Sequence, residues 1–146
     1  MSKATQRQFK VAVVGATGAV GTTMLEILSE RRFPAAEVVA LASPRSAGKR
    51  VKYGETTLKV EDLERYDFAG VDIALFSAGG SVSAVHAPRA ASAGAVVVDN
   101  TSHFRYDDDI PLVVDDEVPP VGVVGEICGL DARQEGVGGP EEQPEI

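Results

Sequence analysis

The sequence predicts an α/β protein with a doubly wound, mainly parallel sheet, and three observations lead to this prediction. Short apolar runs rich in β-branched residues alternate with stretches of helical periodicity, which is the pattern of repeated strand-helix-strand units. A glycine-rich turn joins the first apolar run directly to the first helical stretch. Polar loops follow the apolar runs, and the carboxyl ends of parallel strands share one edge of a sheet. One domain with the first strand at its centre is therefore expected.

The first unit of this fold lies near the amino terminus. Residues 9–14 form a continuous apolar run that predicts a buried strand, and residues 19–32 predict a helix. Thr17 is the expected cap of the first helical turn. The helical face expected to pack on the sheet consists of Val20, Met24, Ile27 and Leu28. Residues 38–42 predict a second strand, parallel to the first, because crossovers of this kind are right-handed.

Four further stretches complete the predicted sheet. Residues 49–63 alternate loosely between apolar and polar side chains, which indicates a hairpin or a pair of edge strands. Residues 71–76 and 95–99 are continuous apolar runs typical of buried strands, and residues 111–114 predict one last short strand.

A second helix is expected between the strands at 71–76 and 95–99. Ser81 is its predicted cap, and Gly94 is its predicted end. Pro88 lies inside this stretch, so the sequence predicts either a kink there or a second helix that starts near His86.

The glycine-rich turn GATGAVG is the first candidate binding site. Gly15 can turn the chain sharply, Gly18 allows a diphosphate to approach the backbone, and Gly21 allows the helix to pack close to the strand. The amino end of a helix also attracts anions. The spacing differs from the commoner G-x-G-x-x-G, and the alternative is that the glycines serve packing alone.

The loop after the second strand bears on the choice of cofactor. NAD-binding units usually carry an acidic residue here for the ribose 2′-hydroxyl, whereas this loop, SPRSAGK, contains none. Ser43, Arg45 and Ser46 instead offer a guanidinium and two hydroxyls, which suit a 2′-phosphate. NADP is therefore the predicted cofactor, the alternative being an ordinary solvated loop.

Two later loops also follow predicted strands. The segment SAGGS, with Ser77, Ala78 and Gly79, should face the dinucleotide. Arg105 in NTSHFR is a candidate for binding an anionic substrate, although an arginine in a loop is more often a surface charge. No metal site is expected, because neither His86 nor His103 has Cys or carboxylate partners at ligand spacing.

Composition limits the partners. The net charge of −8 over 146 residues disfavours nucleic acid and anionic membranes, and no apolar run approaches membrane-spanning length. Cys128 is the single cysteine, which excludes an internal disulfide and fits a reducing cytoplasm.

We expect a loose lead at residues 1–8, a domain at 9–116 and a disordered tail rich in Gly, Pro and acids at 117–146.

Four motifs together resemble the amino-terminal part of the aspartate-semialdehyde dehydrogenases. They are GATGAVG, ASPRSAGK, FSAGGSVS and VDNTSHFR, which start at Gly15, Ala42, Phe76 and Val98. The resemblance covers residues 9–114. The related N-acetyl-glutamyl-phosphate reductases share the first motif but usually lack the RSAGK loop and the VDN-S-FR pattern.

The resemblance implies a Rossmann-like NADP-binding domain and roles for individual residues. It assigns Thr17, Gly18, Ala19 and Val20 to the pyrophosphate, Arg45 and Ser46 to the 2′-phosphate, and Ser77, Ala78 and Gly79 to the nicotinamide side. It assigns Asn100 and Arg105 to the pocket for substrate and phosphate. The resemblance also implies that the full-length proteins are homodimers that act in amino-acid biosynthesis. In them a cysteine forms a thioester with the aspartyl group, and hydride passes between this thioester and NADP. Aspartyl phosphate and its semialdehyde are the substrates.

The chain also departs from the family. The nucleophile of the family lies in an Asn-x-Asn-Cys motif, whereas Cys128 lies in GEICGLD, so no catalytic residue is assigned. We therefore expect an inactive, truncated or frameshifted form of the cofactor-binding part. The alternatives are a non-catalytic dinucleotide-binding regulator and a structural subunit that pairs with a separate catalytic chain.

Overall fold

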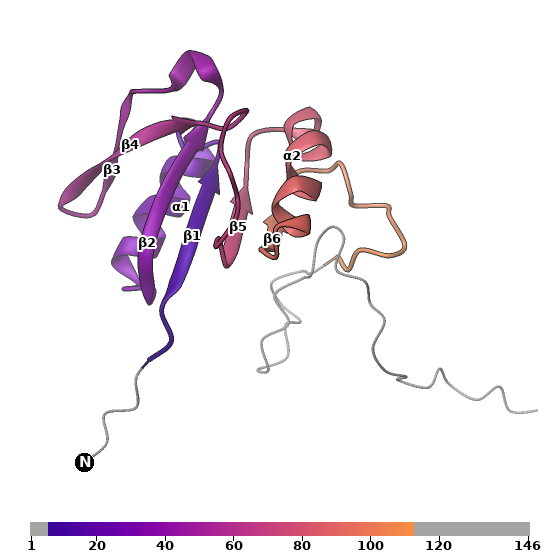
Figure 1. Ribbon diagram of the computed structural model, residues 1–146, viewed down its shortest axis with the longest axis horizontal. Helices are drawn as coiled ribbons and strands as arrows, with labels where there is room; N and C mark the ends of the chain where they lie inside the picture. The colour runs from indigo at the N-terminus through magenta and orange to yellow at the C-terminus, as the bar shows by residue number, and fades with distance from the viewer. Residues whose placement is uncertain (1–5, 113–146) are drawn as a thin grey trace, which may run out of the picture.

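The structure of the chain is a computed structural model that describes residues 6–112 (Figure 1). Strands and helices alternate along these residues as the sequence predicts, except that β3, β4 and β5 follow one another without a helix between them. In chain order they are β1 (Phe9–Val14), α1 (Ala19–Glu30), β2 (Ala35–Ala42), the 3-10 helix η1 (Pro44–Ser46), β3 (Arg50–Tyr53), β4 (Thr56–Asp62), β5 (Ile73–Phe76), α2 (Gly80–Ser92) and β6 (Val96–Asp99).

The strands of the described residues form one sheet in the order β3-β4-β2-β1-β5-β6. β1 lies between β2 and β5 and is parallel to both, and only the β3–β4 hairpin is antiparallel within residues 6–112. The strands from β2 to β4 therefore lie on one side of β1, and β5 and β6 lie on the other. This order confirms the predicted doubly wound sheet with a central first strand. Ligands of such sheets bind where this reversal occurs, at the carboxyl end of β1.

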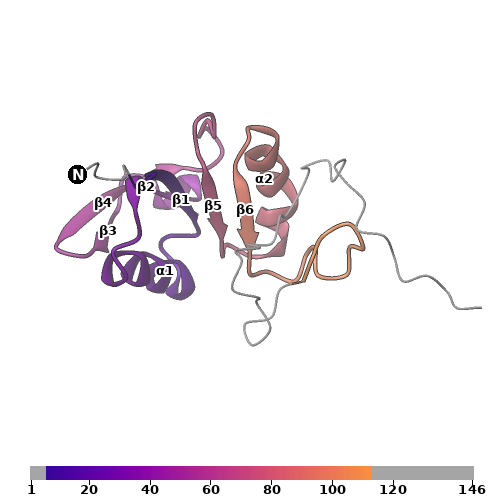
Figure 2. The ribbon, with the colours of Figure 1, turned by 90° about the horizontal axis from the view of Figure 1, so that it is seen from below.

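The two helices cover different faces of the sheet (Figure 2). Leu25 of α1 packs in one apolar cluster with Val13 of β1, whereas Ala87 of α2 packs in another with Val14. Neighbouring residues of a strand point to opposite faces, so β1 contributes to both clusters. Burial on both faces explains why β1 reads as a continuous apolar run.

The buried face of α1 differs from the prediction only in part, because Met24 and Leu28 are half-buried and pack against the apolar cluster of Leu25 as predicted. Gly21 and Leu25 are the buried residues, whereas Val20 and Ile27 are 47% and 40% exposed. Gly21 is the point of closest approach, because a Cβ there would lie 2.1 Å from the carbonyl oxygen of Gly15. This contact sets the rotation of the helix about its axis and turns Val20 and Ile27 outward.

Both predicted helix caps are wrong. The N-cap of α1 is Gly18 and not Thr17, and the N-cap of α2 is Gly79 and not Ser81; neither helix has a side-chain cap. Gly79 has a φ of 98°, which favours glycine over a residue with a side chain. The helices therefore begin where the glycine backbone turns.

The described α2 is a single helix that contains Pro88, so the alternative of a second helix starting near His86 is wrong. Pro88 cannot donate an intrahelical hydrogen bond. The neighbouring Ala87 and Ala90 are both fully buried. We attribute the continuity of the helix to this burial, which stabilises the turns on either side of the proline.

The predicted strand at residues 111–114 is not formed by Pro111 and Leu112, which the structure places outside any strand. Pro111 has no N–H to donate to a neighbouring strand. The rest of that stretch, Cys128 and the predicted tail lie outside the described residues. Within residues 6–112, no helix is long and apolar enough to cross a membrane.

Candidate functional site

The glycine turn follows β1 at the point where the sheet reverses direction. Gly15 has a φ of +87°, and the backbone N–H groups of Gly15 and Ala16 donate to the carbonyl oxygen of Leu41. A Cβ at Gly15 would lie 2.9 Å from the backbone carbon of Ser77. Gly15 is therefore required by its backbone turn, as the sequence predicts, and also by packing. Gly21 is required by packing, as predicted.

Gly18 differs from the other two glycines of the turn. Its φ is −82°, and a Cβ there would have only the oxygen of Gly15 nearby, at 3.4 Å. Neither conformation nor crowding within the described residues explains a glycine at this exposed position. A ligand that approaches the backbone would explain it.

The amino end of α1 presents backbone donors. The first N–H groups of a helix, here those of Ala19, Val20 and Gly21, have no intrahelical acceptor. No side chain within residues 6–112 caps these donors. Such an end has a partial positive charge and suits an anion.

A cavity of about 340 Å³ opens beside the turn. It brings together residues from the carboxyl ends of β1, β2, β4 and β5 and from one side of α2. Its lining residues are Gly15, Thr17, Gly18, Ala42, Ser43, Pro44, Leu63, Glu64, Ser77, Ala78, Val82 and His86. Six of the predicted site residues thus share one cavity, whereas Ala19, Val20, Gly21, Arg45, Ser46 and Gly79 do not line it.

Ser43, Arg45 and Ser46 lie on the tight turn around η1. The N–H of Ser46 donates to the carbonyl oxygen of Ser43 at 2.8 Å. Arg45 is exposed, and within residues 6–112 it forms neither an ion pair nor a side-chain hydrogen bond. Its guanidinium is therefore available to a ligand, and its chain neighbours Ser43 and Pro44 line the cavity.

His86 is a cavity residue that the sequence analysis does not predict. It is half-buried, and its Nδ1 lies 2.6 Å from Nη1 of Arg89. Burial, and then the positive charge of Arg89, lower the pKa of His86, while Glu64 acts in the opposite direction. Leu63, Glu64 and Val82 are also missed, and local sequence carries no signal for them because they meet only through the packing of α2.

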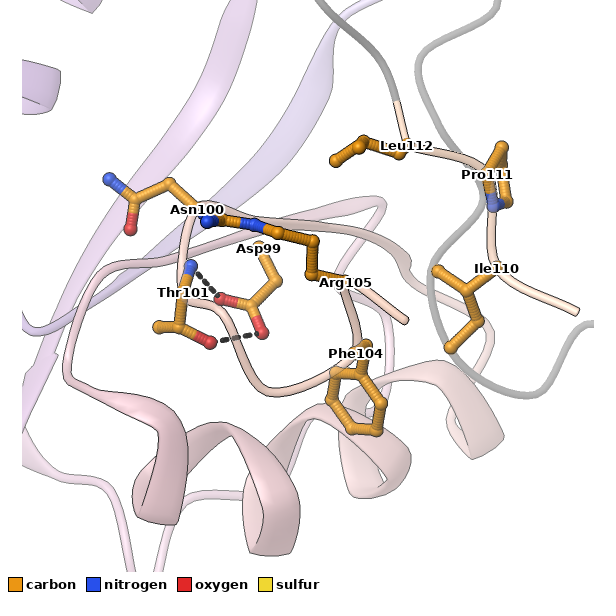
Figure 3. Close-up of a pocket in the computed structure, with 8 residues that line it drawn as sticks. All are labelled: Asp99, Asn100, Thr101, Phe104, Arg105, Ile110, Pro111 and Leu112. Carbon is orange, nitrogen blue, oxygen red and sulfur yellow. Dashed lines mark hydrogen bonds between the residues drawn. The ribbon is translucent and has the colours of Figure 1, made fainter. Parts of the chain in front are cut away.

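A second cavity of about 260 Å³ lies beyond the end of β6 (Figure 3). Asn100 and Arg105, the predicted anion-binding pair, both line it. Asp99 holds the loop by accepting hydrogen bonds from the N–H of Thr101 at 2.8 Å and from its hydroxyl at 2.9 Å. The oxygen of that hydroxyl also lies 3.3 Å from Oγ of the fully buried Ser83, which ties the loop to α2.

The loop that follows β6, residues 100–110, offers no metal centre. His103 packs edge-on against Phe104 with ring centroids 4.5 Å apart, and Asp107, Asp108 and Asp109 are exposed. Among the described residues, no group of three or more His, Cys, Asp or Glu side chains could hold a metal ion.

A central parallel strand, a glycine turn, an uncapped helix end and an adjoining cavity define a dinucleotide-binding α/β domain. Residues 10–120 match the family described as "Semialdehyde dehydrogenase, NAD binding domain". The chain belongs to this family, and the resemblance to the aspartate-semialdehyde dehydrogenases is confirmed.

The similar proteins of known identity are much longer than this chain. Aspartate-semialdehyde dehydrogenase 2 of Vibrio cholerae is 59% identical over 113 residues, which are 77% of this chain and 34% of that protein. The enzyme of Legionella pneumophila is 60% identical over 108 residues, 74% of this chain and 31% of that protein. The chain thus spans about a third of the length of these relatives.

Solved structures give the same result. The V. cholerae aspartate semialdehyde dehydrogenase II, solved with ASA, superposes with a TM-score of 0.71 at 61% identity, covering 74% of this chain and 32% of that one. The Candida albicans enzyme, solved with NADP, has a TM-score of 0.60 at 29% identity, covering 74% and 34%. A Rex-family repressor at 18% identity shares the fold alone, so the regulator alternative is not favoured.

Proposed function

We propose that this chain is an NADP-binding domain of aspartate-semialdehyde dehydrogenase type. The observation that carries the proposal is the amino end of α1, which has no side-chain cap within residues 6–112 and whose N-cap residue, Gly18, lines the same cavity as Ser43. A pyrophosphate over this helix end would accept hydrogen bonds from the backbone and benefit from the helix dipole. Thr17, Ala19, Val20 and Gly21 complete this proposed pyrophosphate site.

The adenosine half would extend from the pyrophosphate toward the end of β2. There Ser43, Arg45 and Ser46 would bind the 2′-phosphate, since the loop carries no acid to repel it. The nicotinamide half would extend toward Ser77, Ala78 and Gly79. The Ser77 hydroxyl already donates to the carbonyl oxygen of Val14 at 3.2 Å, so this residue would contribute shape more than a new hydrogen bond.

Arg45→Ala is expected to weaken NADPH binding roughly tenfold or more and to leave NADH binding nearly unchanged. A charge-assisted hydrogen bond contributes about 1.5–3 kcal/mol, and only NADPH has the 2′-phosphate that Arg45 would contact. The chain contains no Trp, so titration by the fluorescence of the bound nicotinamide is free of tryptophan emission.

Arg31→Ala is the matched control, because Arg31 is an exposed residue at the far end of α1 and its loss changes the net charge equally. Equal affinity of the unaltered chain for NADPH and NADH would contradict the proposed preference for NADP.

Asn100 and Arg105 are proposed to bind the anionic groups of substrate and phosphate. Both side chains are exposed to the second cavity, and the Asp99–Thr101 hydrogen bonds keep their loop in one shape. When bound, the nicotinamide cofactor supplies or accepts hydride. The residues of this chain would hold the two reactants at neighbouring strand ends, which is a contribution of position rather than of covalent chemistry.

The 146-residue chain is expected to show no turnover of aspartate semialdehyde. The thioester chemistry that the resemblance implies needs an activated cysteine, and the sequence lacks the Asn-x-Asn-Cys motif. An assay that follows the formation of NADPH from NADP⁺ in the presence of aspartate semialdehyde and phosphate measures this. Turnover that disappears in Cys128→Ser would overturn the expectation.

From the resemblance we further propose a cytoplasmic protein, with a homodimer for the full-length form.

A further inference from the structure

The contact between His86 and Arg89 determines which ring nitrogen of His86 has the proton. A guanidinium has only donors, so at 2.6 Å from Nη1 of Arg89 the Nδ1 atom must accept. The neutral ring then has its hydrogen on Nε2. Burial and the charge of Arg89 both lower the pKa of His86 and so favour the neutral ring.

Arg89 is itself positioned by hydrogen bonds to two backbone carbonyl oxygens. Its Nη1 donates to the carbonyl oxygen of Leu63 at 3.2 Å, and its Nη2 donates to that of Tyr66 at 2.9 Å. Its Cζ also lies 5.7 Å from the centre of the Phe68 ring. The guanidinium thus links α2 to the segment after β4 and keeps His86 as a donor at the cavity wall.

The cavity around His86 suits a planar base. Pro44, Leu63 and Val82 provide apolar walls, and the carboxylate of Glu64 provides an acceptor. A ribose beside Ser43 would place its base in this part of the cavity, since base and ribose are directly bonded. Apolar walls with one donor and one acceptor are typical of sites that bind a small ring and select its orientation.

Adenine has the edge that matches these two groups. Its exocyclic amino group donates and its neighbouring ring nitrogen accepts, whereas guanine and hypoxanthine present an acceptor oxygen where adenine has the amino group. We propose that Nε2–H of His86 and the carboxylate of Glu64 select adenine as the base of the dinucleotide, with Arg89 as the positioning residue. This inference rests on the proposed function.

The test compares NADPH with its analogue in which hypoxanthine replaces adenine. The unaltered chain is expected to bind the analogue about tenfold or more weakly, because the hypoxanthine oxygen would face the Glu64 carboxylate. Glu64→Gln is expected to bring the two affinities within about twofold, because an amide can either accept from an amino group or donate to an oxygen. Glu64 is exposed, so this variant does not threaten the fold.

Glu55→Gln is the control, since Glu55 is exposed and lies in the β3–β4 turn. Arg89→Met tests the positioning role: nitrogen NMR shifts are expected to show the Nε2–H form of His86 in the unaltered chain and a mixture of both forms in the variant. If the chain binds NADPH and the analogue equally well, the proposed selection of adenine is wrong while NADP binding stands. If it binds neither, the proposed function fails as well.

Discussion

Gly21→Ala is expected to lower the Tm of the domain by more than about 12 °C, or to prevent folding. A Cβ at this position would lie 2.1 Å from the carbonyl oxygen of Gly15 and 2.9 Å from the Cα of Ala16. Both neighbours are backbone atoms of the turn, so relief requires α1 to move away from β1. Overpacking typically costs about 1–3 kcal/mol and occasionally more, and a backbone clash of this size places Gly21→Ala at the upper end, about 3 kcal/mol or more.

Circular dichroism during heating measures this effect, since helix and strand signals are lost together when a small domain unfolds. Gly48→Ala is a useful comparison. Unlike the helical Gly21, Gly48 has a positive φ, of +87°, but a Cβ there would meet nothing within 4 Å. Gly48→Ala should lower the free energy of unfolding only by the conformational strain, about 1–2 kcal/mol. An unchanged Tm for Gly21→Ala would show that the contact between α1 and the turn is looser than the structure has it.

Gly18→Ala is expected to have the opposite profile, with stability retained and cofactor binding weakened. Alanine is compatible with the φ of −82°, and the nearest atom to its Cβ would lie 3.4 Å away. As an N-cap, alanine is slightly worse than glycine, by less than about 1 kcal/mol. The added methyl group would lie where the proposed pyrophosphate approaches the backbone. Losing one charge-assisted hydrogen bond weakens binding roughly tenfold or more.

Titration with NADPH, together with thermal unfolding of the same samples, separates the two glycines. Gly21→Ala should have a lower Tm in the unfolding experiment. Gly18→Ala should retain its stability and bind NADPH more weakly in the titration. If Gly18→Ala binds NADPH as tightly as the unaltered chain, the pyrophosphate does not lie over this turn. Packing and backbone conformation would then account for Gly15 and Gly21, and Gly18 would have no explanation in the structure.

The sequence by itself determined the order of strands and helices, the central place of β1 and the glycine turn. Each of these depends on local chemistry: β-branched apolar runs favour buried strands, and glycine permits the φ of +87° at Gly15. Ser43 and Ser77 could be placed near the turn because the ends of parallel strands share one edge. Four motifs were enough to recognise the family.

The tertiary structure decided the features that depend on how a helix lies against the sheet. Periodicity identified Val20 and Ile27 as core residues, but the close approach of Gly21 to Gly15 rotates α1 and leaves both exposed. Thr17 and Ser81 are good caps by residue type, yet the helices have nearby glycines, Gly18 and Gly79, as their N-caps.

The wall of the cavity is the clearest case. His86 lies on α2 and Glu64 follows β4, and only the packing of α2 over the end of β4 makes them neighbours. Arg89 makes this packing specific by donating to the carbonyl oxygens of Leu63 and Tyr66. Contacts between residues distant in sequence depend on how the elements pack, and local pattern contains no information about that packing.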